Sequence, residues 1–336
     1  MPIKVNSTGN SQEGNEKQIP QLAIPAKTVE VPTVDMPLLP TDTAVLEDDD
    51  LQDTTYEAPE SEVPAGLTQE ELRDPNAITV VIADHKTPIV VLYGPPSCGK
   101  TMTLVRMTRY LASQGYTVIP EKTFRPSYDE NYKQLCDDFG GMINSNSAAT
   151  STTNISFMLV KVLKNGKPIC QLLEAPGEHY FLPDEPNRPY PAYINAIFSS
   201  MNRKIWAIML EPDWSDYEPR ANYVTRISQL KSHYLSPKDK VLFVYNKIDL
   251  TAFVRGAGMV NTKEAINDVQ NLYPNIFVPF KNENPITRFF TKYNCEFVPF
   301  MTGSYSQTMS GGITYTEGHS IYAQRLWQAI LKLLNG

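Results

Sequence analysis

Short apolar runs rich in β-branched residues recur along the chain from residue 78 onward. Two of them, residues 78–82 and 88–93, flank the polar stretch 83–87. This pattern is typical of a β-hairpin, so we expect one there, with order beginning near Ala77. Similar runs cover residues 240–245 and 295–300. The run at 88–93 is continuously apolar, which predicts a strand buried on both faces of a sheet.

A second hairpin is predicted in the middle of the chain. Residues 155–163 and 168–173 are both strand-like, and the turn between them contains Asn165-Gly166. Asn-Gly favours a type I′ turn because both positions need a positive φ. The pattern therefore predicts that these two strands pair antiparallel.

Apolar residues at helical spacing occur between and after these runs. Leu104, Met107, Thr108 and Leu111 fall on one helix face, and Gly115 is placed as a C-terminal stop. The segment 321–334 carries another apolar stripe, for which core packing is favoured over docking into a partner's groove. Strands and helices together predict an α/β domain.

Composition separates the first 75 residues from the rest. They hold 16 acidic and four basic residues, 9 of the 27 prolines and a single aromatic residue, Tyr56. So few large apolar groups cannot offset the entropy of ordering, so we predict a disordered tail at 1–75 and one domain at 76–336. Thr68 followed by Glu70 and Glu71 resembles a helix N-terminus within the tail. A solvated tether and a docking peptide for an effector or activator protein both remain open as its role.

Several classes of protein are excluded by the remaining composition. No apolar run approaches the roughly 18 residues that span a bilayer, and the first ten residues lack the features of a secretory signal. The four cysteines form no C-x-x-C pair, which favours free thiols in a reducing cytoplasm. The density of Lys and Arg in the body is too low for a dedicated nucleic-acid binder.

A glycine-rich loop follows the buried run at 88–93. Residues 94–101 read Gly-Pro-Pro-Ser-Cys-Gly-Lys-Thr and match the Walker A phosphate loop, G-x-x-x-x-G-K-[ST]. Gly94 and Gly99 let the backbone curl around phosphate oxygens. Amides from Ser97 and Cys98 onward, near the start of the following helix, are expected to face the anion.

Lys100 and Thr101 supply the charged and metal-binding groups of this loop. The Lys100 ammonium is expected to neutralise the β- and γ-phosphates, and the Thr101 hydroxyl is a ligand for Mg²⁺. Pro95 and Pro96 lack amide donors, but they lie early in the loop, so phosphate binding is expected to survive.

The strand-like run 240–245 ends in Asn246-Lys247-Ile248-Asp249, an N-K-x-D tetrapeptide. A carboxylate at Asp249 accepts both N1–H and the exocyclic amine of guanine, a donor pair that adenine lacks. The stem of Lys247 can cover a face of the base, and Asn246 can brace the phosphate loop. The pattern therefore predicts selection of guanine at the carboxyl end of a strand.

Together, these motifs resemble those of P-loop GTPases of the translation-factor and Ras-like (TRAFAC) class, over about residues 88–334. The predicted hairpin ends in Glu174-Ala175-Pro176-Gly177, where the family has D-x-x-G. The resemblance implies that Glu174 holds Mg²⁺ through water and that the Gly177 amide senses the γ-phosphate. It also implies a three-layer P-loop sandwich with a mostly parallel sheet and one antiparallel hairpin.

The same resemblance implies further site residues. Glu178 and His179 stand where the family has its water-orienting Gln or His, so they are candidate catalytic residues together with Lys100. A hydroxyl at Thr152, or at the adjacent Thr153, would complete the Mg²⁺ shell. Thr302 and Gly303 fall where the family touches guanine O6 through backbone amides.

The function that these residues favour is binding of GTP and GDP with Mg²⁺ and slow hydrolysis of GTP by a molecular switch. Two alternatives remain open on the sequence. A P-loop ATPase would also use Gly-Pro-Pro-x-x-Gly-Lys-Thr, and a non-hydrolysing interaction module would explain the unusual residue at Glu178.

Overall fold

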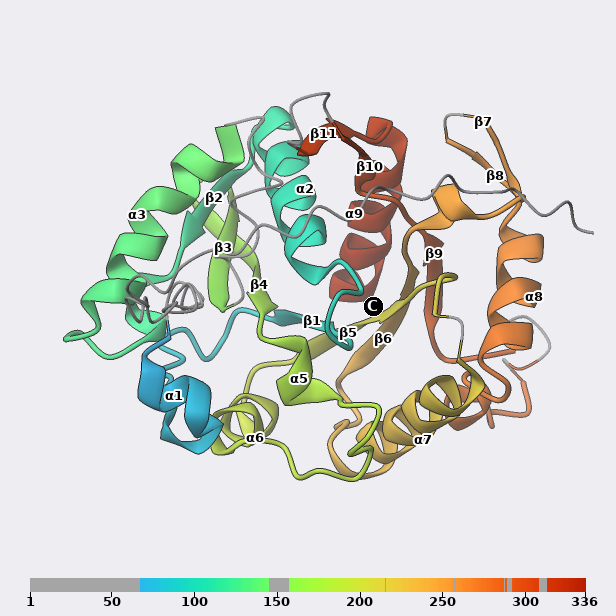
Figure 1. Cartoon of the computed structure of the whole chain (residues 1–336), viewed down its shortest axis with the longest axis horizontal. Coiled ribbons are helices and arrows are strands. Elements are labelled where there is room, and N and C mark those ends of the chain that lie inside the picture. The colour runs from blue at the N-terminus through green and yellow to red at the C-terminus, as the bar shows by residue number, and fades with distance from the viewer. Residues whose placement is uncertain are drawn as a thin grey trace, which may run out of the picture. The chain divides into compact units, whose positions relative to one another are not determined.

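The computed structural model describes residues 67–144, 157–214, 216–256, 258–286, 288, 292–307 and 313–336 (Figure 1). Residues 1–66, which make up most of the predicted tail, lie outside the described residues, as do Thr152 and Thr153.

A seven-stranded sheet forms the centre of the domain, in the order β2-β3-β4-β1-β5-β6-β9. Its strands are β1 (Ile89–Tyr93), β2 (Thr117–Pro120), β3 (Met158–Lys164), β4 (Lys167–Glu174), β5 (Lys204–Leu210), β6 (Lys240–Tyr245) and β9 (Glu296–Pro299). β3 runs antiparallel to both β2 and β4, and the other neighbouring pairs are parallel. Every residue of β1 and β5 is buried, which accounts for their continuous apolar sequences.

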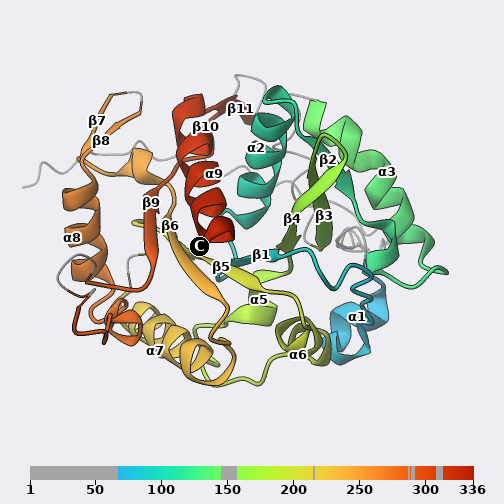
Figure 2. The same ribbon diagram turned by 180° about the vertical axis from the view of Figure 1, so that it is seen from behind.

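Helices cover both faces of this sheet and produce three layers. The helices in the described residues are α1 (Gln69–Arg73), α2 (Lys100–Ser113), α3 (Glu130–Asn144), α5 (Gly177–Tyr180), α6 (Ala192–Ser199), α7 (Tyr217–His233), α8 (Thr262–Leu272) and α9 (Ser320–Asn335). α2 and α9 pack together on one face, whereas α5, α6 and α7 lie on the other (Figures 1 and 2). The predicted three-layer α/β fold is therefore confirmed.

The hairpin and the two helices predicted from local pattern are confirmed. β3 and β4 pair through a turn in which Asn165 and Gly166 have φ values of 51° and 74°. α2 buries Leu104, Met107, Thr108 and Leu111, and Gly115 has a φ of 70° just after its end. α9 buries its apolar stripe in the core, as the spacing predicts.

The hairpin predicted for residues 78–82 and 88–93 is wrong. Only the second run forms a strand, β1, while residues 78–82 are irregular, with Val81 donating one backbone hydrogen bond to Phe124. The reason is tertiary, because β4 and β5 occupy both edges of β1 and leave no edge for a hairpin partner.

Order also begins earlier than the predicted Ala77. Leu67 is 2% exposed, and α1 opens with a capping box in which Thr68 and Glu71 bond each other's backbone. The 3₁₀ turn η1 (Pro75–Ala77) follows it. The helix-like signal at Thr68 was therefore genuine, and this stretch belongs to the folded domain because its apolar residue and Glu71 are buried.

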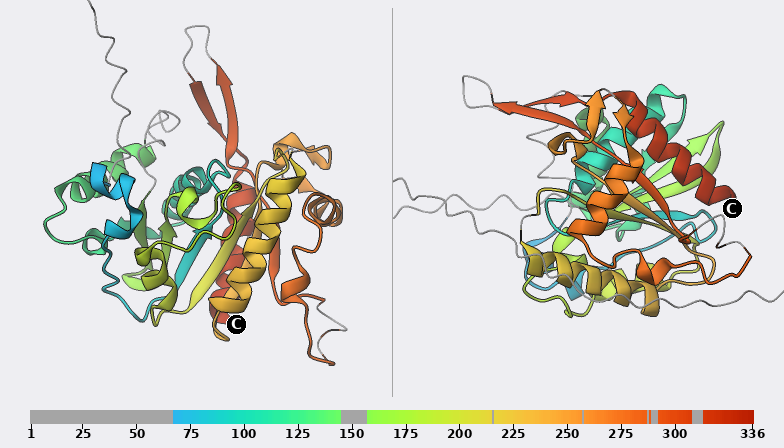
Figure 3. Two further views of the ribbon diagram at one scale, coloured as in Figure 1. Left: turned by 60° about the horizontal axis from the view of Figure 1, so that its bottom comes forward. Right: turned by 90° about the vertical axis from the view of Figure 1, so that its right-hand side faces the viewer.

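Two further strand pairs form small sheets separate from the central one. A short antiparallel pair, β7 (Val254–Gly256) and β8 (Met259–Val260), precedes α8, and the 3₁₀ turn η5 (Val278–Phe280) follows it. A second pair, β10 (Gly303–Gln307) and β11 (Ile313–Glu317), projects from the domain between β9 and α9 (Figure 3). Sequence analysis did not predict this projecting hairpin.

Candidate functional site

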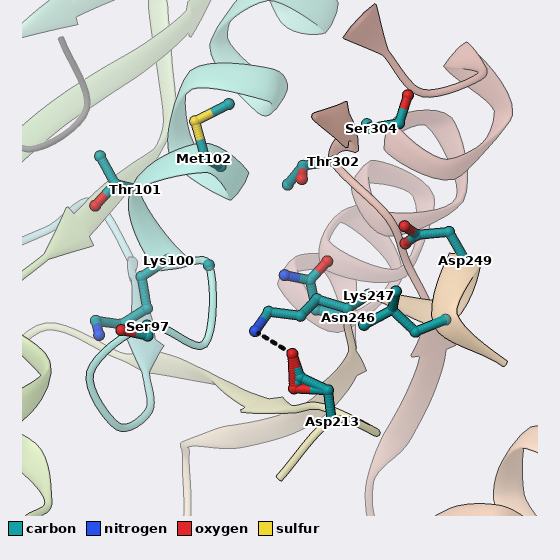
Figure 4. A pocket seen from close by; sticks show the side chains of 13 residues that line it. Ser97, Lys100, Thr101, Met102, Asp213, Asn246, Lys247, Asp249, Thr302 and Ser304 are labelled. Atoms are coloured by element: carbon teal, nitrogen blue, oxygen red, sulfur yellow. Dashed lines mark hydrogen bonds and ion pairs between the residues drawn. The ribbon is translucent and has the colours of Figure 1, made fainter. Parts of the chain in front are cut away.

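A cavity of about 700 Å³ lies at the carboxyl ends of the parallel strands, within the usual range for ligand pockets. Most of its wall comes from three segments that are far apart in the sequence: the phosphate loop, the Asn246–Asp249 segment and the Thr302–Ser304 segment. Figure 4 shows Lys100 and Thr101 on one side of it and Asp249 and Lys247 on the other. The structure thus brings together three segments that the sequence assigned to phosphate or guanine binding.

The phosphate loop joins β1 to α2 and has a tightly curled backbone. Ser97 and Gly99 have φ values of 62° and 88°. Gly99 cannot carry a side chain, because a Cβ there would lie 2.3 Å from Nδ2 of Asn246. At Gly94 a Cβ would lie 2.7 Å from Sγ of Cys98. Both loop glycines therefore have a steric reason, and Gly99 has a conformational one as well.

The start of α2 presents the groups that suit an anion. The helix begins at Lys100, and its N-cap residue Gly99 offers no side-chain cap, so the first amides of the helix are open to a ligand. Lys100 is buried, and its Nζ donates to the carbonyls of Gly94 (3.2 Å) and Pro95 (2.9 Å). The ammonium is thus held within the loop, beside the cavity.

The side chains of Thr101 and Glu174 place oxygen atoms that suit a hard metal ion next to this loop. The Thr101 hydroxyl donates to Oε1 of Glu174, at the end of β4. Oε2 of the same carboxyl is buried and has no hydrogen-bond partner within the described residues. Burial raises the pKa of Glu174 to about 8, against the lowering effects of Thr101 and Lys100.

These two residues fit a Mg²⁺ ion, which prefers oxygen ligands and takes only a few of them from the protein at a phosphate site. An unpartnered buried carboxylate oxygen is costly without a cation. No cluster of three or more His, Cys, Asp or Glu suited to a metal occurs among the described residues. Thr152, the third predicted ligand, lies outside the described residues.

The N-K-x-D segment braces the phosphate loop as predicted. Asn246 is buried, and its Nδ2 donates to the carbonyl of Cys98 at 3.0 Å. The Cys98 thiol is fully buried, which raises its pKa to about 11, so it remains a thiol. Asp249 lies in the 3₁₀ turn η4 (Ile248–Leu250), exposed at the mouth of the cavity.

Two acidic residues that sequence analysis missed hold Lys247. Its Nζ lies 2.5 Å from Oε2 of Glu211 and 3.2 Å from Oδ2 of Asp213, which also lines the cavity (Figure 4). Burial raises the pKa of Glu211, and the adjacent Lys247 opposes that rise. A signal was present, since both acids directly follow the apolar run that forms β5.

Thr302 and Gly303 lie opposite the phosphate loop, as the resemblance implies, but they are not part of a simple loop. Thr302 is buried, and Gly303 begins β10 of the projecting hairpin. Both residues line the cavity together with Ser304.

Gly177 and its neighbours stand at the other end of the phosphate loop. A Cβ on Gly177 would lie 2.3 Å from the Pro96 nitrogen and 2.4 Å from the Pro95 carbonyl carbon, so the two backbones touch. Glu178 is exposed in the first turn of α5. His179 is buried, and its Nδ1 is 2.7 Å from Oη of Tyr193.

The two predicted water-positioning residues do not line the cavity in this conformation. Burial lowers the pKa of His179 to about 4, so its imidazole is neutral. Both residues instead line a much smaller hollow beside Arg226.

The sheet order, the phosphate loop after β1 and the antiparallel β3–β4 hairpin together define a three-layer α/β fold of the P-loop type. No family model matches the chain, and no curated protein matches it. Among the described residues, no helix is long and apolar enough to cross a membrane.

Solved structures do match the chain. One is a nucleolar GTP-binding protein 1 from Plasmodium falciparum, with 11% identity, a TM-score of 0.36 and coverage of 76% of this chain and 90% of that one. The Ski7 GTPase-like domain of S. cerevisiae bound to GDP and inorganic phosphate matches with 13% identity, a TM-score of 0.35 and coverage of 78% and 52%. The same domain bound to GTP matches with 14% identity, a TM-score of 0.35 and coverage of 75% of this chain and 50% of that one. The chain spans about half the length of these two yeast structures.

Proposed function

We propose that this protein binds GTP and GDP with Mg²⁺ in the cavity and hydrolyses GTP slowly, as a molecular switch. The observation that carries the proposal is the convergence of the phosphate loop, Asp249 and the Thr302–Ser304 segment on one cavity of about 700 Å³. This convergence supports a phosphate-binding end and a base-binding end within one pocket.

Each residue has a distinct part in this proposal. The amides at the start of α2 and the ammonium of Lys100 bind the phosphates. Thr101 and Glu174 hold Mg²⁺, which neutralises charge on the phosphate oxygens. Asp249 accepts the two guanine donors, and the stem of Lys247, oriented by Glu211 and Asp213, lies against the base.

The slow rate in this proposal follows from the β4–α5 junction. Glu178 is exposed and His179 faces Tyr193, so neither is placed to orient a water molecule before a rearrangement. The same observation favours the second candidate, a nucleotide-binding module that does not hydrolyse GTP. The proposal includes an effector or activator protein as partner. It also includes a cytoplasmic location, which the four free cysteines support.

Competition between nucleotides tests the guanine assignment. GDP is expected to displace a fluorescent GDP analogue at least about 100-fold better than ADP, since each hydrogen bond to Asp249 is worth about 1.5–3 kcal/mol. Asp249→Asn is expected to shift preference toward xanthosine diphosphate, because an amide donates to the xanthine O2 that replaces the guanine amine.

Asp138→Asn is the matched control, since Asp138 is exposed on α3 and bonds only Gln134 among the described contacts of its side chain. It should leave the guanine preference intact. Equal competition by ADP against the wild-type protein would refute the proposal and leave the ATPase alternative.

A further inference from the structure

Residues at the base of the β10–β11 hairpin form hydrogen bonds with the Thr302–Gly303 segment. The Thr302 carbonyl accepts two hydrogen bonds, from Oη of Tyr315 at 2.8 Å and from the amide of Gly318 at 2.9 Å. Thr302 and Tyr315 are 7% and 8% exposed. A carbonyl with two buried donors has little freedom to rotate.

Gly303 is pressed against the opposite strand. A Cβ there would lie 2.2 Å from the Thr316 carbonyl oxygen and 2.7 Å from the ring of Tyr315. The Gly318 amide donates to the Thr302 carbonyl, so these two residues face each other as a hydrogen-bonded pair. Since such pairs alternate along an antiparallel ladder, the next pair, Gly303 and Glu317, is a non-hydrogen-bonded one. The Gly303 amide therefore points away from β11, and Gly303 lies in the cavity wall.

The end of β11 is tied to the helix that carries the phosphate loop. Glu317 forms ion pairs with Arg106 and with Arg109 (2.8 Å), both on α2. Arg106 is 5% exposed, and its Nη2 also donates to the Gly318 carbonyl at 2.6 Å. Figure 1 shows β11 beside the α2 end that is distant from the phosphate loop.

We propose that Tyr315 and Glu317 are positioning residues for base recognition, which set the Gly303 amide at hydrogen-bonding distance from the exocyclic oxygen of guanine. Through Glu317 and Arg106, the position of this amide depends on α2 and hence on the phosphate end of the cavity. The inference rests on the proposed function, and it adds a specificity device that belongs to the inserted hairpin.

The test compares the affinities of GDP and 6-thio-GDP. The thio analogue keeps both donors for Asp249 and replaces only the exocyclic oxygen with sulfur, a weaker acceptor. The wild-type protein is expected to prefer GDP. Tyr315→Phe removes one hydroxyl and keeps the ring, and it is expected to reduce this preference by about three- to tenfold, the value of one hydrogen bond. Glu317→Gln should act in the same direction.

Inosine diphosphate provides the readout that a merely structural defect would move. It retains the exocyclic oxygen and lacks the amine that Asp249 binds, so the preference for GDP over inosine diphosphate should remain that of wild type in both variants. Tyr217→Phe, at an exposed tyrosine of α7, should change neither preference.

Two results overturn the inference: full discrimination against 6-thio-GDP in Tyr315→Phe, or equal losses for all three nucleotides. Failure of the proposed function looks different, because the wild-type protein would then bind ADP as well as GDP.

Discussion

Glu174 illustrates how burial changes the chemistry of a single residue. Its position at the end of β4 was predicted from a four-residue motif, but its protonation depends on surroundings that the motif does not specify. The carboxyl is 1% exposed, bonds Thr101 through one oxygen and leaves the other unpartnered among the described residues. Burial therefore favours the neutral acid until a cation is present.

We expect the stability of the protein without Mg²⁺ to fall as pH rises from about 4.5 to about 8. Burial raises the pKa of Glu174 in the folded protein from its ordinary value of 4.5 to about 8, so the folded state binds the proton more tightly than the unfolded state does. The contribution of Glu174 to the free energy of unfolding is therefore full below its unfolded pKa of 4.5 and is lost as pH rises through its folded pKa of about 8. Glu174→Gln should flatten this part of the curve.

Urea unfolding across this pH range measures the effect, and Glu264→Gln, at a partly exposed glutamate of α8 that pairs with Arg255, is the control that should keep the wild-type slope. Parallel curves for wild type and Glu174→Gln would show that the carboxyl is ionised in the folded protein. Added Mg²⁺ should reduce the slope of the wild-type curve, because the ion favours the carboxylate.

At the scale of elements, the junction between β4 and α5 combines a tightly packed glycine with an exposed acidic residue. Gly177 touches the backbone of Pro95 and Pro96, whereas Glu178 is exposed one residue later. A short helix of four residues supports this turn, and the His179–Tyr193 contact connects it to α6.

Glu178→Ala is expected to leave the affinity for GTP unchanged and to reduce its turnover. A group that positions water acts mainly in the transition state, where such contributions are typically about 10²–10⁴-fold. Single-turnover phosphate release measures the chemical step, and Glu218→Ala, in the first turn of α7, is the matched control.

Faster hydrolysis in Glu178→Ala would contradict this expectation. It would mean that the carboxylate repels the charge that develops on the phosphate, and that an activator supplies the missing group. Unchanged turnover would leave His179 as the better candidate.

At the scale of the whole domain, the first described residues act as part of the fold. Glu71 of α1 forms an ion pair with Arg125, which also bonds Asp129 and the Thr79 carbonyl. The Arg125 side chain is 4% exposed, so all these groups are largely removed from water. α1 is therefore held, through the Glu71–Arg125 ion pair, against the segment between η2 (Lys122–Phe124) and α3.

Two truncations separate this contact from the acidic tail. Removal of residues 1–66 is expected to leave the melting temperature and the GDP affinity unchanged, because that segment has few apolar groups to bury. Removal of residues 1–75 also deletes Glu71 and leaves Arg125 with one carboxylate fewer. Loss of one partner from a buried pair costs up to about 3–5 kcal/mol, so the melting temperature should fall by several degrees.

Scanning calorimetry of the two truncated proteins measures this difference. Equal melting temperatures would show that α1 adds no stability, and a loss with the shorter truncation would show that residues before Leu67 pack on the domain.

The sequence by itself was sufficient for features that depend on nearby residues. Local sequence patterns predicted the phosphate loop, the Asn165-Gly166 turn, the buried stripes of α2 and α9 and the cap at Thr68. Each depends on φ preferences, helical spacing or a short motif within a few residues. The rule that ligands bind at the carboxyl ends of parallel strands pointed to the Asn246–Asp249 segment, and the resemblance to P-loop GTPases pointed to Thr302 and Gly303.

Tertiary structure alone decided the rest. Residues 78–82 have the composition of a strand, but β4 and β5 already flank β1. The acids that hold Lys247 come from the segment after β5, and Glu317 reaches α2 across more than 200 residues of sequence. Such contacts depend on which strand edges are free and which charges become buried together, and these quantities exist only once the sheet has assembled.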